Sequence, residues 1–158
     1  MSHGLKIVLV EPEIPQNTGS IGRLCLATQT ELHLVEPLGF EITESRLRRA
    51  GLDYWEHLNV RTHASLDAFL EQLPENAPLA LFSKKAGHTL FEWKFEPGTW
   101  LIFGKETQGL PKPLLHRFAL QSVRIPMFDA RVRSLNLANA ASIAVYEAIR
   151  QLGVSSID

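Results

Sequence analysis

Cysteine is almost absent from this sequence of 158 residues, in which Cys25 stands alone. A single cysteine excludes an internal disulfide and a metal site built from several thiolates. Cys25 is flanked by Leu24, Leu26 and Ala27, so we expect it to be a small buried apolar residue. The sequence also holds no cluster of metal-ligating residue types, and we expect no metal.

Long apolar runs are missing as well. No run approaches the roughly 20 residues that a membrane-spanning helix needs. The N-terminus lacks a basic segment followed by a long apolar one, which is the pattern of a secretory signal. We therefore expect a cytoplasmic protein with no membrane partner.

Net charge is low, at −1 at pH 7, so the charge of the whole chain favours no class of partner. Its distribution is more informative. Between Lys105 and Arg133 the basic residues outnumber the acidic ones, which are Glu106 and Asp129. This segment allows a local anionic partner, and a solvated basic face is the alternative.

The common nucleotide and hydrolase motifs are also absent. A P-loop requires Gly-x-x-x-x-Gly-Lys-Ser/Thr, whereas Gly104-Lys105 is followed by Glu106. A dinucleotide-binding fingerprint requires Gly-x-Gly-x-x-Gly after the first strand, but the strand Leu5–Val10 leads into Glu11-Pro12-Glu13-Ile14-Pro15. No Gly-x-Ser-x-Gly elbow occurs.

What the sequence does contain is an apolar run between glycines, in the stretch Gly98–Pro111. Trp100–Phe103 has the pattern of a strand buried on both faces. Gly104 ends it, and Gly109 lies near the end of the loop that follows; both glycines allow a close approach of the backbone to a ligand. Loops at the carboxyl ends of such strands hold small molecules in open α/β sheets. An ordinary turn is the alternative.

Alternation of apolar runs with helical patterns predicts an α/β fold, with a mainly parallel sheet flanked by helices. We expect a single domain over residues 1–158. The predicted strands are Leu5–Val10, Leu32–Val35, Leu58–Thr62, Leu79–Ser83, Trp100–Phe103 and Ser122–Ile125. The predicted helices are Ser20–Thr28 capped by Asn17 or Thr18, Glu44–Ala50 capped by Thr43, Ser65–Leu73 capped by Ser65, Leu114–Phe118, and Asn136–Leu152 ended by Gly153.

Polar residues stand out on two of these helices. Arg23 interrupts the otherwise apolar helix Ser20–Thr28, where it either reaches water along its own stem or faces an anion. On the last helix, core packing explains the many alanines, which also permit the close approach of another helix. It does not explain Asn136 and Asn139, because asparagine is weak in helix interiors.

Four stretches in order resemble the motifs of the SPOUT RNA methyltransferases: Pro15–Arg23, Phe103–Pro111, Ile125–Met127 and Arg133–Asn139. Further stretches resemble the minimal tRNA (cytidine/uridine-34) 2′-O-methyltransferases: Glu36–Phe40, Arg46–Tyr54 and Tyr146–Gln151. The resemblance implies a C-terminal trefoil knot. It also implies methyl transfer from S-adenosyl-L-methionine to the ribose 2′-hydroxyl of the wobble nucleotide, position 34, of leucine tRNAs.

The same resemblance assigns roles to individual residues. Cofactor-binding positions are Leu81, Gly104, Ile125, Ser134 and Leu135. Arg23 is the catalytic residue, and we favour stabilisation of charge on the ribose oxygen over a general base, because a guanidinium stays protonated. The expected substrate-RNA residues are Asn17, which would set its loop, and Arg133 and Tyr146, which would line the side that meets the tRNA anticodon stem-loop, across a homodimer interface. No metal takes part.

Other readings remain open at this point. One is a 2′-O-methyltransferase acting on another tRNA or rRNA position. A second is a non-catalytic RNA-binding homologue, which would bind RNA but not the cofactor. A third is a plain α/β domain whose dimer is its function.

Overall fold

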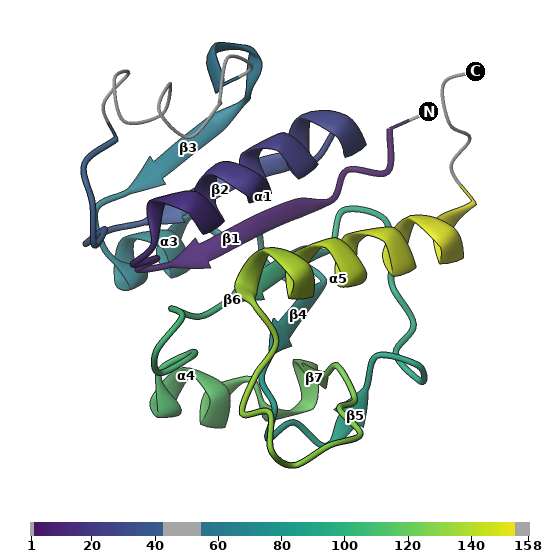
Figure 1. The fold of residues 1–158 in the computed structure, drawn as a ribbon. Helices are drawn as coiled ribbons and strands as arrows, with labels where there is room; N and C mark the ends of the chain where they lie inside the picture. Colours follow the sequence, from purple (N-terminus) through teal and green to yellow (C-terminus); the bar gives the residue numbers. More distant parts are fainter. Residues whose placement is uncertain (1, 43–54, 154–158) are drawn as a thin grey trace.

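The computed structural model describes residues 2–42 and 55–153, and within them one parallel sheet forms the centre of the molecule (Figure 1). The strand order is β3-β2-β1-β6-β4-β7-β5, and every pair of neighbours is parallel. The strands are β1 (Lys6–Val10), β2 (Glu31–Val35), β3 (Val60–His63), β4 (Leu79–Phe82), β5 (His88–Thr89), β6 (Trp100–Phe103) and β7 (Ser122–Arg124). The α/β fold with a mainly parallel sheet is therefore confirmed.

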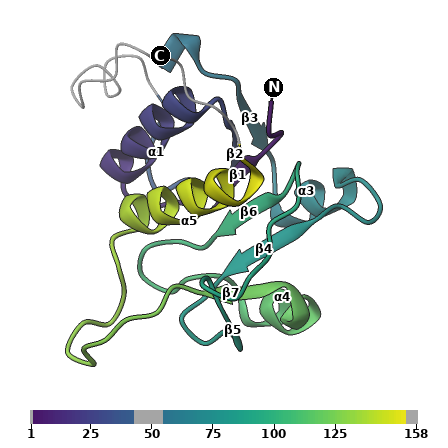
Figure 2. The same ribbon diagram turned by 90° about the vertical axis from the view of Figure 1, so that its right-hand side faces the viewer.

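Helices cover both faces of this sheet (Figure 2). They are α1 (Pro15–Thr28), α3 (Leu66–Gln72), α4 (Lys112–Arg117) and α5 (Leu137–Leu152), with short 3₁₀ turns η1 (Trp55–His57) and η2 (Ala119–Gln121). Among the described residues, no helix is both long and apolar enough to cross a membrane.

Alternation along each strand divides the core between the two faces. In β1, Ile7 and Leu9 face the core that α1 and α5 cover, whereas Val8 and Val10 face the core that α3 and α4 cover. Ala141, Ala144 and Ala148 of α5 are fully buried in the first core, and α5 contacts α1 directly. The small side chains of α5 therefore serve packing within this chain.

Several predicted boundaries are wrong. Helix α1 begins at Pro15 rather than near Ser20, so Asn17 and Thr18 lie inside it and do not cap it. Proline suits a first helical turn because it has no N–H to satisfy there. Strand β5 was not predicted, since it has only two residues, both polar. The helix predicted over residues 44–50 lies outside the described residues.

Other helix ends are confirmed. The Ser65 hydroxyl accepts a hydrogen bond from the N–H of Ala68 at 3.1 Å and caps α3. Gly153 ends α5 with φ 71°, a left-handed conformation that glycine adopts without strain. The short helix predicted over residues 114–118 is present but begins earlier, at Lys112. The trefoil knot stays a prediction.

Candidate active site

The loops that carry the sequence motifs gather at one edge of the sheet. Because all strands are parallel, the segments that follow β1, β4, β6 and β7 leave the sheet at the same, carboxyl-terminal edge. This is the edge where open α/β sheets bind ligands. Four chain segments thus meet there: residues 11–14, 83–87, 104–111 and 125–136.

Two of these segments bind each other through the carboxylates of Glu106 and Glu13. Glu106 accepts hydrogen bonds from the backbone N–H groups of Glu13 at 2.9 Å and Ile14 at 2.7 Å. In return, the Glu13 carboxylate accepts from the N–H of Thr107 at 3.0 Å and from its hydroxyl at 2.7 Å. The bonds from Thr107 lower the pKa of Glu13 below its usual value. This exchange fixes the loop after β6 to the start of α1, where a negative charge is favourable.

Asn17 extends this connection to the loop after β7. Its side-chain N–H donates to Glu106 at 3.2 Å, and its oxygen accepts from the side-chain N–H of Asn136 at 3.0 Å. The Asn136 oxygen accepts from the backbone N–H groups of Ala138 and Asn139 and so caps α5. Asn17 is buried and both ends of its amide are used inside the protein. This geometry favours setting the loop over direct contact with RNA.

The loop after β6 closes tightly on itself at Gly104. Lys105 and Gly109 form an antiparallel bridge, and Gly109 has φ +69°. A Cβ atom at Gly104 would lie 2.0 Å from the Gly109 carbonyl carbon and 2.1 Å from the Leu110 nitrogen. Position 104 therefore requires glycine for loop closure, whatever ligand the loop binds. Its role as a cofactor contact stays a prediction.

Apolar side chains lie beneath these loops. The rings of Phe82 and Phe103, the last residues of β4 and β6, are stacked with centroids 4.6 Å apart. Ile125 and Leu137, from either end of the loop after β7, pack in the same core cluster. Leu81, another predicted cofactor contact, has no exposed surface and belongs to the opposite core. Its contact with a cofactor stays a prediction.

The remaining predicted residues lie on the surface. Arg23 is exposed on α1, and its guanidinium forms no ion pair within residues 2–42 and 55–153. Ser134 is exposed and Leu135 half-buried in the loop after β7. Arg133 is exposed in the same loop, and its carbonyl oxygen accepts a hydrogen bond from Lys84 at 3.3 Å. Tyr146 is 56% exposed on α5.

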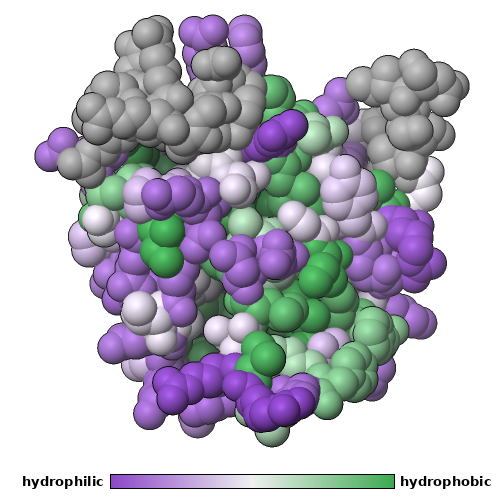
Figure 3. Space-filling view, viewed as in Figure 1, coloured by the Kyte–Doolittle hydropathy of each residue, from purple (hydrophilic) through white to green (hydrophobic). Residues whose placement is uncertain are grey.

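Tyr146 is one member of an exposed stripe along α5 with helical spacing: Asn139, Ile143, Tyr146 and Arg150. Leu26 is exposed on the neighbouring helix α1. Figure 3 shows apolar residues gathered near the centre of this face, over α5. The asparagines of α5 thus have separate explanations, since Asn136 is the cap and Asn139 belongs to this exposed stripe.

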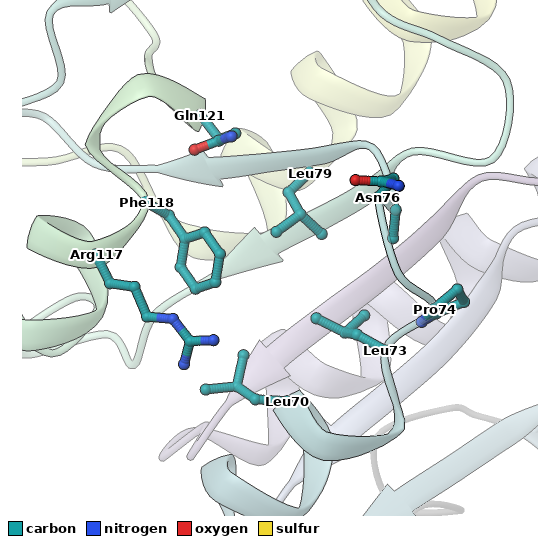
Figure 4. A pocket seen from close by; sticks show the side chains of 9 residues that line it. Leu70, Leu73, Pro74, Asn76, Leu79, Arg117, Phe118 and Gln121 are labelled. Atoms are coloured by element: carbon teal, nitrogen blue, oxygen red, sulfur yellow. The ribbon is translucent and has the colours of Figure 1, made fainter.

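A pocket of about 300 Å³ lies elsewhere (Figure 4). Its lining residues come from the end of α3, the segment before β4 and the segment before β7: Leu70, Leu73, Pro74, Asn76, Ala77, Leu79, Arg117, Phe118 and Gln121. These segments lie at the amino ends of the strands. The pocket is therefore separate from the motif loops.

Glu106 was the residue most important to this arrangement to which sequence reasoning gave no role. The sequence feature that could have identified it is its position between Gly104 and Gly109. That segment was interpreted only for the backbone conformation that its glycines allow. No group of three or more His, Cys, Asp or Glu side chains that could hold a metal ion occurs in the part of the chain that the structure describes.

The sequence of this chain is similar to those of known RNA methyltransferases. Residues 4–146 match the model of the SpoU rRNA Methylase family. A Burkholderia pseudomallei protein named tRNA (cytidine(34)-2′-O)-methyltransferase is 48% identical, over 93% of this chain and 95% of its own length. A Saccharophagus degradans protein of the same name is 53% identical, with 93% and 95% covered.

Solved structures give the same result. One that concerns the 2-OH methylation of C/U34 on tRNA has a TM-score of 0.89 at 48% identity, covering 94% of this chain and 96% of that one. The SpoU methyltransferase AviRb from Streptomyces viridochromogenes, in complex with the cofactor AdoMet, has a TM-score of 0.82 at 25% identity, covering 99% of this chain and 60% of that one. The chain therefore belongs to the SpoU methylase family.

Proposed function

We propose that this protein is a cytoplasmic tRNA 2′-O-methyltransferase that methylates the ribose of the wobble nucleotide, position 34, and that its substrates are leucine tRNAs. The observation that carries the proposal is the hydrogen-bonded connection Glu106–Asn17–Asn136, which joins the start of α1 to the loops after β6 and β7 at one edge of the sheet. Relatives at 48% and 53% identity, named for cytidine 34, support this position in tRNA. The whole chain would act as one domain.

The carboxyl edge fits S-adenosyl-L-methionine as the methyl donor. An adenine ring needs an apolar slot with nearby backbone donors and acceptors. The side chains of Phe82, Phe103 and Ile125 supply the apolar surface. The loops that follow β4, β6 and β7 supply the backbone donors and acceptors. Our candidates to bind S-adenosyl-L-methionine are Gly104, Ser134 and Leu135, which lie in these loops. Leu81, just before the loop that follows β4, is a further candidate. Bound there, the donor would supply a methyl group on a positively charged sulfur.

Arg23 is our candidate for the catalytic side chain. The ribose oxygen must gain the methyl group and lose its proton to solvent water, so negative charge develops on that oxygen during the transfer. A guanidinium stays protonated and cannot take the proton. It can bind the neighbouring phosphate and stabilise the developing charge at once. The exposed Arg23 has no ion-pair partner among the described residues, which leaves it available for an anion.

A homodimer would complete this site. The exposed stripe of α5 contains Ile143 and Tyr146, which are 42% and 56% exposed, and Leu26 lies on the neighbouring helix. A second copy packed on this surface would remove these side chains from water. Arg23 is exposed on α1, so the interface would border the catalytic residue. Light scattering should give twice the chain mass, and a fully active monomer would contradict the dimer.

The experiment that tests the function is the mapping of 2′-O-methyl groups in tRNA from cells with and without this protein. Loss of methylation at nucleotide 34 alone is the expected result, and the tRNAs affected identify the isoacceptors. Unchanged nucleotide 34 with loss at another position would assign the enzyme to a different site. Calorimetry with S-adenosyl-L-methionine in the presence of a chelator distinguishes an enzyme from an RNA-binding homologue, which would release no heat.

A further inference from the structure

The loop between β7 and α5 exposes an aromatic ring. Phe128 is 89% exposed, more than any other large apolar side chain among the described residues. Figure 2 shows the chain between β7 and α5 extending away from the sheet and helices. An isolated exposed apolar residue is common on protein surfaces, so the surroundings of Phe128 decide whether its exposure has a function.

A compact turn holds the chain next to Phe128. The Asp129 carboxylate accepts from the backbone N–H of Arg131 at 2.9 Å and from its guanidinium at 2.6 Å. The N–H of Val132 donates to the Asp129 carbonyl oxygen at 3.3 Å. These bonds order the segment that immediately follows Phe128, whereas the ring itself is 89% exposed. Arg131 also neutralises Asp129, the acidic residue nearest to the ring in sequence.

Three cations near this turn, unlike Arg131, lack acidic partners among the described residues. Lys84 donates to the carbonyl oxygen of Arg133, which places the segment after β4 against this loop. The side chains of Lys84, Lys85 and Arg133 are exposed, and none forms an ion pair in the described ranges. The loop that exposes the Phe128 ring thus also carries the unpaired Arg133 and lies against the segment of Lys84 and Lys85. Aromatic rings on which bases stack and cations that attract phosphates together bind single-stranded nucleic acid.

We propose that Phe128 is a stacking platform for an unpaired base of the anticodon loop, with Lys84, Lys85 and Arg133 binding the adjacent phosphates. This inference rests on the proposed function, because it takes tRNA as the substrate. A second copy of the chain is the other candidate to cover Phe128. It fits less well, because the cores of protein–protein interfaces are depleted of lysine, whereas unpaired bases in RNA loops are bound by aromatic rings.

The test measures the affinity of the full-length protein for a fluorescent anticodon stem-loop. Phe128→Ala and Phe128→Leu should each weaken binding on the order of tenfold, because both remove the aromatic face. Phe128→Trp should keep the wild-type affinity. Leu120→Ala is the matched control, since Leu120 is 78% exposed but lies before β7, at the opposite edge. Affinity for S-adenosyl-L-methionine should be the same in all variants.

Two further measurements make the role specific. Stem-loops with one abasic loop nucleotide should show a position at which the wild-type protein loses affinity and Phe128→Ala loses none. The salt dependence of binding should fall for Arg133→Ala and stay unchanged for Phe128→Ala, because only the first removes a phosphate contact.

Each result has one meaning. Equal RNA affinity of Phe128→Ala and wild type would overturn the inference. The inference would also be overturned if the wild-type protein is a dimer and Phe128→Ala is a monomer, because the ring would then contact a second copy. If the wild-type protein methylates tRNA while the Phe128 variants bind it equally well, this inference fails and the proposed function stands. If the wild-type protein transfers no methyl group to any tRNA, the proposed function itself fails.

Discussion

The carboxylate of Glu106 lies 2.7 Å from the backbone nitrogen of Ile14, 92 residues away in the sequence. Helix α1 has no capping side chain of its own, so the loop after β6 supplies one. The same carboxylate binds Asn17, which links it to the start of α5. One acidic side chain therefore holds together the loops on which we place both substrates.

Replacing Glu106 should destabilise the protein. Glu106→Gln keeps the shape but loses the charge that strengthens bonds to N–H groups at a helix start, and we expect a loss of about 1–3 kcal/mol in the free energy of unfolding. Urea denaturation measures it. Glu75→Gln, an exposed acid in the segment before β4, is the control and should change stability by less than about 0.5 kcal/mol. Equal stability of both variants would refute this role for Glu106.

Gly104 offers a test of loop closure. A Cβ atom there would lie 2.0 Å from the Gly109 carbonyl carbon, so Gly104→Ala must displace the backbone, at a cost of about 1–3 kcal/mol. Thermal unfolding should show the loss, and calorimetry should show weakened binding of S-adenosyl-L-methionine. At Gly87 a Cβ atom would meet nothing within 4 Å, so Gly87→Ala should change neither. Normal cofactor binding by Gly104→Ala would contradict our account of this loop.

The sequence predicted the strands well because of their local composition. Runs such as Trp100–Phe103 are apolar at every position, as burial on both faces requires. The beginning of α1 could not be predicted in the same way, because Glu106 stabilises it from a distant segment. Strand β5 has too few residues to carry a pattern, and only its pairing with β7 defines it.

Prediction of the site was limited for a similar reason. The sequence motifs included Asn17 and Asn136, but the contacts of Asn17 with Asn136 and with Glu106 depend on how the start of α1 meets two separate loops. The alanines of α5 were explained by core packing, and they also permitted the close approach of another helix. Ala141, Ala144 and Ala148 lie in this chain's own core, where α1 is the helix that approaches α5.

Acid should destabilise the edge of the sheet at β3. His33 is buried, and its ring nitrogens lie 2.8 Å from His63 and 2.7 Å from Glu31. Burial lowers the pKa of His33, against the opposing effect of Glu31, and burial also lowers the pKa of His63. The unfolded state, with histidine pKa values of about 6.5, then binds more protons than the folded state below that pH.

Stability should therefore be complete above about pH 6.5 and should fall as the pH drops below it, by up to about 1.4 kcal/mol per pH unit for each proton taken up. Urea denaturation between pH 5 and 8 measures this slope. His63→Gln can still hydrogen-bond His33 but does not titrate, so its slope should be smaller. A slope that is unchanged in His63→Gln would remove His63 from this explanation.

Arg23 should affect chemistry rather than cofactor binding. If its guanidinium stabilises charge on the ribose oxygen, Arg23→Ala should lower the single-turnover rate on the order of a hundredfold or more. Arg23→Lys should recover little, because lysine lacks the planar fork that contacts a phosphate and a hydroxyl together. The affinity for S-adenosyl-L-methionine should be unchanged in both. A near-wild-type rate for Arg23→Ala would leave Arg23 as an ordinary surface residue.

The central claim is methyl transfer to the 2′-hydroxyl of nucleotide 34, and removal of that single hydroxyl tests it most directly. Two anticodon stem-loops of a leucine tRNA are compared, identical except that one has a 2′-deoxyribose at position 34. Each is incubated with the protein and S-adenosyl-L-methionine carrying a labelled methyl group. We predict labelling of the all-ribose stem-loop at nucleotide 34 and none of the deoxy stem-loop. Equal labelling of both, or labelling of neither, would contradict the claim.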